Sequence, residues 1–237
     1  MIDSLLIGLS GIQSSLFKQR VSSENLANVS TNGYKAGQAQ TSVSENGEVS
    51  ATVSLSQQQG AFIPTTGRLQ VTIDGNGFFR VMLDDEYSYT RSGAFVVNNE
   101  GMLSTAQGYS LSPSIQVSGG IDSISIASDG TVYGINAESG VIDELGTLQL
   151  FEFADPSKLQ QIGGGLFKAT EASGSATAGK AGSGGLGTIL PGGLEASNVD
   201  LATEMVDQTL AQRGVEANVK TIQTADEILG TVMDLIG

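Results

Sequence analysis

A periodic run at the C-terminal end of the chain limits the possible folds most strongly. From Leu201 to Ile236, positions spaced alternately by four and three residues form one unbroken line, and apolar residues dominate it from Val215 onward. This spacing is typical of an α-helix with a single narrow apolar stripe. Ser197 or Asn198 is placed to cap its first turn. We therefore expect a long helix over residues 197–237.

A second, weaker stripe lies at the N-terminal end. Its apolar positions are Leu5, Leu9, Ile12, Leu16 and Leu26. Gly8 and Gly11 interrupt it and lower the helix propensity. A helix with so narrow a stripe gains little stability alone and needs another surface to cover it. We expect the two terminal helices to pair as a coiled coil, with each other or with the helices of neighbouring molecules.

The middle of the chain has the character of β-structure. Short runs rich in β-branched and aromatic residues follow one another from 67 to about 170, for example LQVTI at 69–73 and GFFRVML at 77–83. Turn sequences such as DGNG at 74–77 separate these runs. The pattern predicts an antiparallel, mainly β domain built from hairpins. The expected fold class is α+β: a mainly β middle domain and long terminal helices that form a discontinuous helical domain as a coiled coil.

The expected domain boundaries follow these changes of character. They are an N-terminal helix in 1–35, an extended connecting segment in 36–66, a β-rich domain in 67–170, a Gly/Ser-rich connection in 171–196 and a C-terminal helix in 197–237. The extended segment is polar and favours at most one loose strand. The Gly/Ser-rich connection has too few large apolar residues to bury a core, so we expect it to be flexible.

Composition argues against several classes of function. The net charge is −14 with only 11 Lys and Arg residues, too few to neutralise nucleic-acid phosphates or to favour an anionic membrane. Histidine and cysteine are both absent, which removes thiol and imidazole catalysis and the zinc sites built on those residues. We therefore expect no enzyme, no metal and no cofactor. No apolar run approaches the length of about 18 residues that a membrane helix needs, and no cleavable secretory signal is visible.

Three local motifs have plainer interpretations than a binding site. GSATAGK at 174–180 resembles a phosphate-binding loop, but alanine follows where the magnesium ligand is needed and glycines follow where a helix is needed. The DGNG run lacks the later ligands of a calcium loop, so we interpret it as a hairpin turn. The acidic triplet at 84–86 is interpreted as a solvated turn between two strands.

The segment NLANVSTNGYK at 25–35 ends the N-terminal helix. Asn32-Gly33 is a strong turn sequence, and the polar residues before it compete with the helical backbone. The segment resembles the signature of flagellar basal-body rod and hook proteins, N-L-A-N-x-x-T-x-G-[YF]-K/R. The C-terminal helix is similar as well: Gln212-Arg213, Glu216 and Asn218 match the family's Q-R-x-[YF]-E-x-N element, although Gly214 and Val215 depart from it. GNGFFRV at 75–81 and YTRSGAFVVNNEGML at 89–103 also resemble the β-domain that these subunits share.

This resemblance implies a structural axial subunit of the bacterial flagellar basal body that self-assembles into the tubular rod and transmits motor torque to the hook. The terminal helices would form the inner tube and the β-domain its outer wall. The subunit would leave the cell through type III export without a cleaved signal peptide and act in the periplasm. Its partners would be further copies, adjacent rod and hook subunits and the surrounding ring proteins. Distal rod proteins are the most similar subtype, and the proximal rod subunit is the nearest rival.

Other interpretations stay open. A secreted β-domain that binds a carbohydrate or a receptor would not need the helices, and a hook-type subunit would share the motifs. Under the rod interpretation, the predicted assembly interface is Leu5, Leu9, Ile12, Leu16, Asn25, Leu26, Asn28, Gly33, Tyr34, Val215, Val219, Ile222, Leu229, Met233 and Ile236. The ligand of the signature segment would then be a neighbouring copy. Gly33→Val is accordingly expected to harm assembly more than it harms the β-domain.

Overall fold

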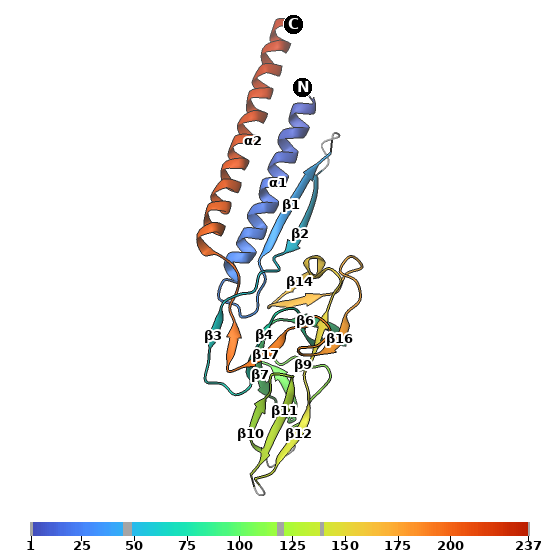
Figure 1. Cartoon of the computed structure of the whole chain (residues 1–237). Coiled ribbons are helices and arrows are strands. Elements are labelled where there is room, and N and C mark those ends of the chain that lie inside the picture. Colours follow the sequence, from blue (N-terminus) through green and yellow to red (C-terminus); the bar gives the residue numbers. More distant parts are fainter. Residues whose placement is uncertain (1, 45–48, 118–120, 138–139, 237) are drawn as a thin grey trace. The chain divides into compact units, whose positions relative to one another are not determined.

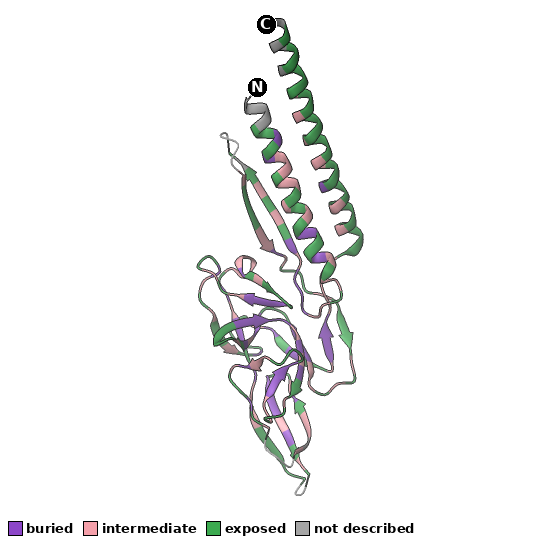
Figure 2. Cartoon of the chain, turned by 180° about the vertical axis from the view of Figure 1, so that it is seen from behind, coloured by how far each residue is buried: buried purple, intermediate pink, exposed green. Residues whose placement is uncertain are grey.

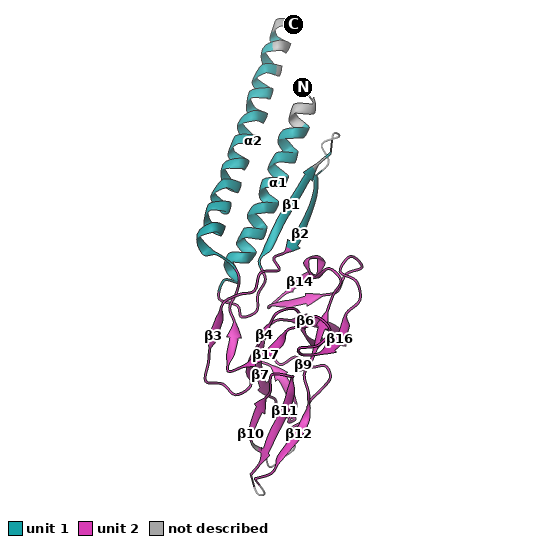
Figure 3. Cartoon of the chain, in the orientation of Figure 1, with its two compact units in different colours: residues 1–29, 36–54, 199–237 teal, residues 30–35, 55–198 magenta. Residues whose placement is uncertain are grey.

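The chain forms two compact units in its computed structural model, which describes residues 2–44, 49–117, 121–137 and 140–236 (Figure 3). The first, here called the helical unit, consists of Met1–Val29, Ala36–Ser54 and Val199–Gly237. The second, here called the β unit, consists of Ser30–Lys35 and Leu55–Asn198. Both units are therefore discontinuous in sequence. No helix in the described ranges has both the length and the apolar character needed to cross a membrane.

The helical unit contains two long α-helices and a two-stranded ribbon. Helix α1 (Ile2–Ala27) lies between helix α2 (Leu201–Ile236) and strand β1 (Gly37–Val43), and β1 pairs with β2 (Val49–Leu55) (Figure 1). The cap of α2 differs from the sequence prediction. The carboxylate of Asp200 accepts hydrogen bonds from the N–H groups of Ala202 at 2.9 Å and Thr203 at 3.2 Å, so Asp200 caps the helix instead of Ser197 or Asn198.

The predicted coiled coil is wrong: the chain is mostly β with two terminal helices, and small residues line the contact between them. A Cβ atom on Gly8 would lie 2.8 Å from Ile222 Cγ1, and one on Gly11 would lie 2.5 Å from Asn218 Oδ1. Meanwhile Leu9 and Leu16, which should be coiled-coil knobs, are 49% and 50% exposed. Glycine allows the helix backbones to approach closely, so the glycine face of α1 faces α2, while Leu9 and Leu16 remain half exposed.

This contact predicts different effects for two Gly→Ala substitutions in helices. Alanine raises the helix propensity by up to about 1 kcal/mol at either site. At Gly230 nothing lies within 4 Å of the new Cβ, so we expect a gain. At Gly11 the new Cβ would overlap the side-chain amide of Asn218, which must move and give up its hydrogen bond to the carbonyl of Gly214, so we expect this gain to be cancelled. Urea unfolding followed by circular dichroism at 222 nm measures both, and an equal gain at both sites would show that the helices do not touch at Gly11.

The β unit is built on one large antiparallel sheet. This nine-stranded sheet has the order β14-β15-β6-β5-β9-β8-β7-β4-β17. Its strands are β4 (Gln70–Asp74), β5 (Phe79–Leu83), β6 (Glu86–Thr90), β7 (Gly93–Val97), β8 (Leu103–Thr105), β9 (Ser110–Leu111), β14 (Gln160–Gly163), β15 (Leu166–Lys168) and β17 (Thr188–Pro191). Strand β5 shows why the sequence favours it. Phe79 and Val81 are buried and alternate with the more exposed Arg80 and Met82, as one face of a sheet requires.

Smaller sheets complete the β unit. Their strands are β10 (Ile121–Ile126), β11 (Thr131–Asn136) and β12 (Ile142–Thr147) in one antiparallel sheet, β13 (Gln149–Glu152) with β16 (Thr177–Lys180), and β3 (Phe62–Pro64) with β18 (Gly193–Glu195). A short 3₁₀ helix, η1 (Pro156–Lys158), follows β13. The main core is mostly aliphatic, with Val71, Leu103 and Ile189 fully buried. A second core cluster is aromatic and contains Phe151 and Phe167.

Two segments that the sequence described as irregular contain strands. The polar segment 36–66 holds β1, β2 and β3, more than the single loose strand expected. The Gly/Ser-rich stretch 171–196, expected to be flexible, holds β16, β17 and β18. Strand β17 pairs with β4 and places Ile189 in the main core at 0% exposure. Backbone hydrogen bonds to neighbouring strands order this stretch, and such bonds do not depend on side-chain hydrophobicity.

Candidate assembly surface and the signature segment

The signature segment at 25–35 is divided between the two units. Its first part closes the helical unit through Asn25, which is 2% exposed. The Asn25 amide donates to the carbonyl of Gly37 and to Glu204 Oε1, both at 2.8 Å, and its Oδ1 accepts from the N–H of Gly37 at 2.8 Å. One side chain thereby joins α1, the start of β1 and α2. Asn28 donates to the carbonyl of Glu24 at 2.8 Å and so completes the last turn of α1.

The second part of the signature, Ser30–Lys35, is built into the β unit. Gly33 has a φ of +70°, and its N–H donates to the carbonyl of Glu195 at 2.8 Å. A Cβ atom on Gly33 would lie 2.5 Å from the nitrogen of Ser92, so only glycine fits here. Tyr34 is buried, and its hydroxyl donates to Gln161 Oε1 at 3.4 Å.

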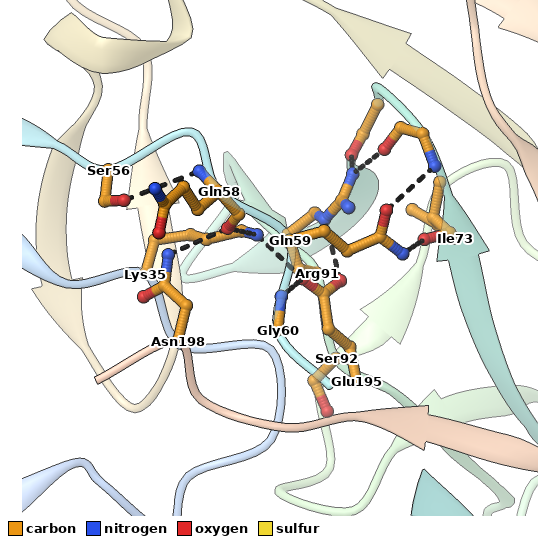
Figure 4. Close-up of polar contacts among 12 residues, drawn as sticks. Lys35, Ser56, Gln58, Gln59, Gly60, Ile73, Arg91, Ser92, Glu195 and Asn198 are labelled. Carbon is orange, nitrogen blue, oxygen red and sulfur yellow. Dashed lines mark hydrogen bonds and ion pairs between the residues drawn. The ribbon is translucent and has the colours of Figure 1, made fainter. Parts of the chain in front are cut away.

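Lys35 ends the signature in a buried ion pair. Its Nζ donates to Glu195 Oε1 at 2.7 Å and to the carbonyl of Gln58 at 2.7 Å (Figure 4). The Lys35 and Glu195 side chains are only 6% and 1% exposed. Oε1 of Glu195 also accepts from the N–H of Gly60 at 3.0 Å. A carboxylate from near the end of the β unit therefore holds a lysine from near the start of the chain.

Arg91 makes the pair into a buried charge cluster of Lys35, Arg91 and Glu195. Its Nε donates to Glu195 Oε2 at 3.1 Å, and its Nη1 donates to the carbonyls of Gly75 at 2.8 Å and Gly77 at 2.7 Å. Burial lowers the pKa of Lys35; Glu195 opposes this effect, and the positive charge of Arg91 adds to it. Two buried cations thus share one carboxylate, and backbone carbonyls supply part of the missing negative charge.

The helical unit exposes many large apolar side chains. Figure 2 shows that most of α2 and parts of α1 are exposed. The exposed apolar residues of α1 and α2 are Leu6, Ile7, Leu9, Leu16, Leu201, Met205, Val206, Leu210, Val219 and Ile228. We call this set the apolar surface of the helical unit. Isolated exposed apolar residues are normal, whereas a dense set on two neighbouring helices makes these helices the candidate interaction surface.

The predicted interface residues fall into several groups. Leu9, Leu16 and Val219 are exposed and belong to the apolar surface. Those partly covered within the chain are Ile12, Leu26, Asn28, Val215 and Ile222. Those buried within their own unit are Asn25, Gly33 and Tyr34. The side chains that lie outside the described part of the chain are Leu5, Leu229, Met233 and Ile236.

Comparison with known proteins identifies the family of this chain. Residues 72–134 match the family model of the flagellar hook protein FlgE/F/G D1 domain, and residues 190–235 match that of the flagellar basal body rod FlgEFG protein C-terminal region. The flagellar basal-body rod protein FlgG of Bacillus subtilis strain 168 is 35% identical over an aligned length of 263 residues, and the alignment covers 99% of each chain. The chain belongs to the flagellar basal-body rod protein family. The FlgG of Borreliella burgdorferi is 34% identical over an aligned length of 262 residues, and this alignment also covers 99% of each chain.

Likeness to hook proteins is more limited. The flagellar hook protein FlgE of Escherichia coli K12 is 43% identical over 117 residues, which cover 49% of this chain and 29% of the hook protein. Hook proteins, which share the sequence motifs, therefore match only part of the chain, whereas the rod proteins match it from end to end. This rod protein is a structural subunit of the flagellar basal body and takes part in motility.

Sequence reasoning missed the acidic partners of the signature in this rod protein. Glu195 and Glu204 pair with Lys35 and Asn25 across 160 and 179 residues of chain. Arg91 lies inside the motif at 89–103 but had no assigned role. One available signal was the charge pattern: only 11 Lys and Arg residues occur in the chain, and one of them follows the otherwise uncharged segment 25–34, directly beside the aromatic Tyr34.

The lowered pKa of Lys35 predicts a specific pH dependence. Below the lowered pKa, lysine is charged in both the folded and the unfolded rod protein. As the pH rises from the lowered pKa towards the ordinary value of 10.5, the folded protein loses this proton first, so the unfolded state binds more protons. The contribution of Lys35 to the free energy of unfolding should therefore rise with pH in this window. The difference between wild type and Lys35→Met, measured by urea unfolding at several pH values, should show this rise, and a flat or falling difference would contradict it.

Proposed function

We propose that copies of this rod protein assemble through the apolar surface of the helical unit into the tubular rod that transmits motor torque to the hook. The observation that carries the proposal is the exposure of large side chains on both helices, such as Leu16 at 50%, Met205 at 56% and Leu210 at 62%. The glycine-lined contact between α1 and α2 leaves these side chains uncovered within the chain. Another copy of the same surface is the simplest cover for them in a structural rod subunit.

The energy available from this surface is comparable with the cost of association. Complete burial of a large apolar side chain contributes about 1.5–3 kcal/mol, so burying the exposed half of Leu9 or Leu16 contributes about half of that. Summed over the whole apolar surface, the gain is on the order of ten kcal/mol, which exceeds the lower estimates of about 4 kcal/mol for lost translational and rotational freedom. The net charge of −14 opposes association, so salt should promote it by screening.

The finer features of the role belong to the same proposal. The helical unit would line the tube and the β unit would form its outer wall. The subunit would pass through type III export without a cleaved signal peptide and work in the periplasm, next to other rod and hook subunits and the surrounding rings. The length and the middle motifs of the chain favour the distal rod subtype over the proximal one.

Substitution within the apolar surface tests the proposal. The double variant Leu9→Ser/Leu16→Ser should raise the concentration needed for assembly about 10- to 100-fold, since it removes about 1.5–3 kcal/mol of burial and each 1.4 kcal/mol is tenfold. Sedimentation of the concentrated protein over a dilution series measures this concentration. Ile142→Ser in the β unit, where the side chain is 64% exposed, is the matched control and should change little. Equal effects of both substitutions would overturn the proposed interface.

A further inference from the structure

A cavity within the β unit lies against the buried charge cluster. It has a volume of about 370 Å³, and its walls include both buried cations, Lys35 and Arg91. Its remaining lining includes amide side chains, two phenylalanine rings and one acidic residue, namely Gln57, Gln59, Asn76, Phe78, Phe153 and Glu152. The volume lies at the lower end of the range for ligand pockets, so it suits a small group.

The charge cluster carries an excess of positive charge beside this cavity. Lys35 and Arg91 share the single carboxylate of Glu195, and no second ion pair to either cation occurs in the part of the chain that the structure describes. The carbonyl oxygens that they contact offset this charge only in part. A buried charge without a full partner is costly, so a negative group in the cavity would be stabilised.

Hydrogen-bond donors remain on both cations. A lysine ammonium has three donors, and in the described ranges two hydrogen bonds from Lys35 are formed, to Glu195 and Gln58. The guanidinium of Arg91 uses Nε and Nη1, and no described residue accepts from its Nη2. Guanidinium and ammonium donors side by side suit a carboxylate better than a neutral acceptor, because charge-assisted hydrogen bonds are the stronger ones.

We propose that the cavity at Lys35 and Arg91 binds a carboxylate group on a short apolar stem. The carboxylate accepts hydrogen bonds from the remaining donors of the two cations, and the stem contacts Phe78 and Phe153. Glu152, which also lines the cavity, repels the ligand and limits its affinity. The carboxylate belongs either to an acidic side chain of a second copy or to a free small molecule. This cavity lies in the β unit and is distinct from the apolar surface of the helical unit, so a free carboxylate can test it without assembly.

Titration of the full-length protein with sodium propionate tests the site. The NMR resonances of the Lys35 and Arg91 side chains should move saturably, with a dissociation constant on the order of millimolar, which is modest for so small a ligand. Neutral propionamide, and sodium chloride at the same ionic strength, should not reproduce the change. Glu152→Gln should tighten propionate binding roughly threefold to tenfold, because it removes a like charge. Glu100→Gln, an exposed acidic residue that does not line the cavity, should leave binding unchanged.

Two further arms separate the sources of the carboxylate. If the same resonances move when copies assemble without propionate, and propionate reverses that movement, the ligand is an acidic side chain of a second copy. If propionate binds saturably and assembly has no effect on these resonances, or no assembly occurs, the ligand is a free carboxylate and the site stands even where the proposed function fails. Resonances that respond to propionate only as they respond to chloride would overturn the proposal.

Discussion

Glu195→Gln is expected to lower the free energy of unfolding of the β unit by about 3–5 kcal/mol. The substitution keeps the shape of the side chain but removes the one carboxylate that Lys35 and Arg91 share. Breaking a buried ion pair from one side leaves an uncompensated charge, which is the costly case. Urea unfolding followed by tyrosine fluorescence measures the effect in the β unit alone. The sequence contains 5 tyrosines and no tryptophan, and the tyrosines, all of the β unit, are Tyr34, Tyr87, Tyr89, Tyr109 and Tyr133.

A surface ion pair provides the control for this prediction. Glu86 pairs with Lys168, and their side chains are 65% and 45% exposed, so Glu86→Gln should cost no more than about 1 kcal/mol. The double variant Lys35→Met/Glu195→Gln should lose less stability than the sum of the two single variants, because the lysine charge is then absent. A loss for Glu195→Gln as small as that for Glu86→Gln would show that the buried charge cluster does not stabilise the β unit.

Gly33→Ala is expected to destabilise the β unit by about 2–5 kcal/mol. A positive φ of 70° costs an alanine about 1–2 kcal/mol, and the new Cβ would lie 2.5 Å from Ser92 N and 2.6 Å from the carbonyl carbon of Arg91. Because both neighbours are backbone atoms, the chain itself must move, which adds about 1–3 kcal/mol. This reverses the expectation from sequence, in which a Gly33 substitution harms assembly more than the β-domain. Tyrosine fluorescence during urea unfolding measures the loss.

A second glycine separates the two causes. Gly184 has a φ of +63°, and nothing lies within 4 Å of a Cβ built on it. Gly184→Ala should therefore show only the backbone cost of about 1–2 kcal/mol. If Gly33→Ala and Gly184→Ala lose the same stability, the close approach of the signature segment to Arg91 and Ser92 is not real.

Local patterns in the sequence predict the elements of this protein better than their contacts. The four-three spacing from Leu201 onward corresponds to α2, and the alternation around Val81 corresponds to β5. The stripe did not reveal what covers it. An apolar stripe looks the same whether the partner is in the same chain or another, so pairing of the two helices as a coiled coil was the wrong inference. Gly8 and Gly11 were considered as weak points of a helix, whereas the structure uses them for close approach to α2.

The signature segment shows a second limit of structure prediction from local sequence. Its turn at Gly33 was predictable from Asn32-Gly33 alone, and the positive φ confirms that part. Its division between two units was not predictable, because the partners Glu195 and Glu204 lie 160 and 179 residues away. The strands in 171–196 were missed for a related reason. Gly-rich sequence lacks hydrophobic periodicity, and backbone pairing with β4 and β13 supplies the order instead.

Electron cryo-microscopy of the concentrated protein can show whether copies join through the helical unit. It can also show whether the signature segment makes its contacts within its own chain. We expect tubes in which neighbouring copies cover Leu9, Leu16 and Met205, and in which Lys35 and Glu195 of the same chain remain paired. Tubes in which these apolar side chains face solvent would contradict this expectation. So would tubes in which Lys35 of one copy pairs with Glu195 of the next.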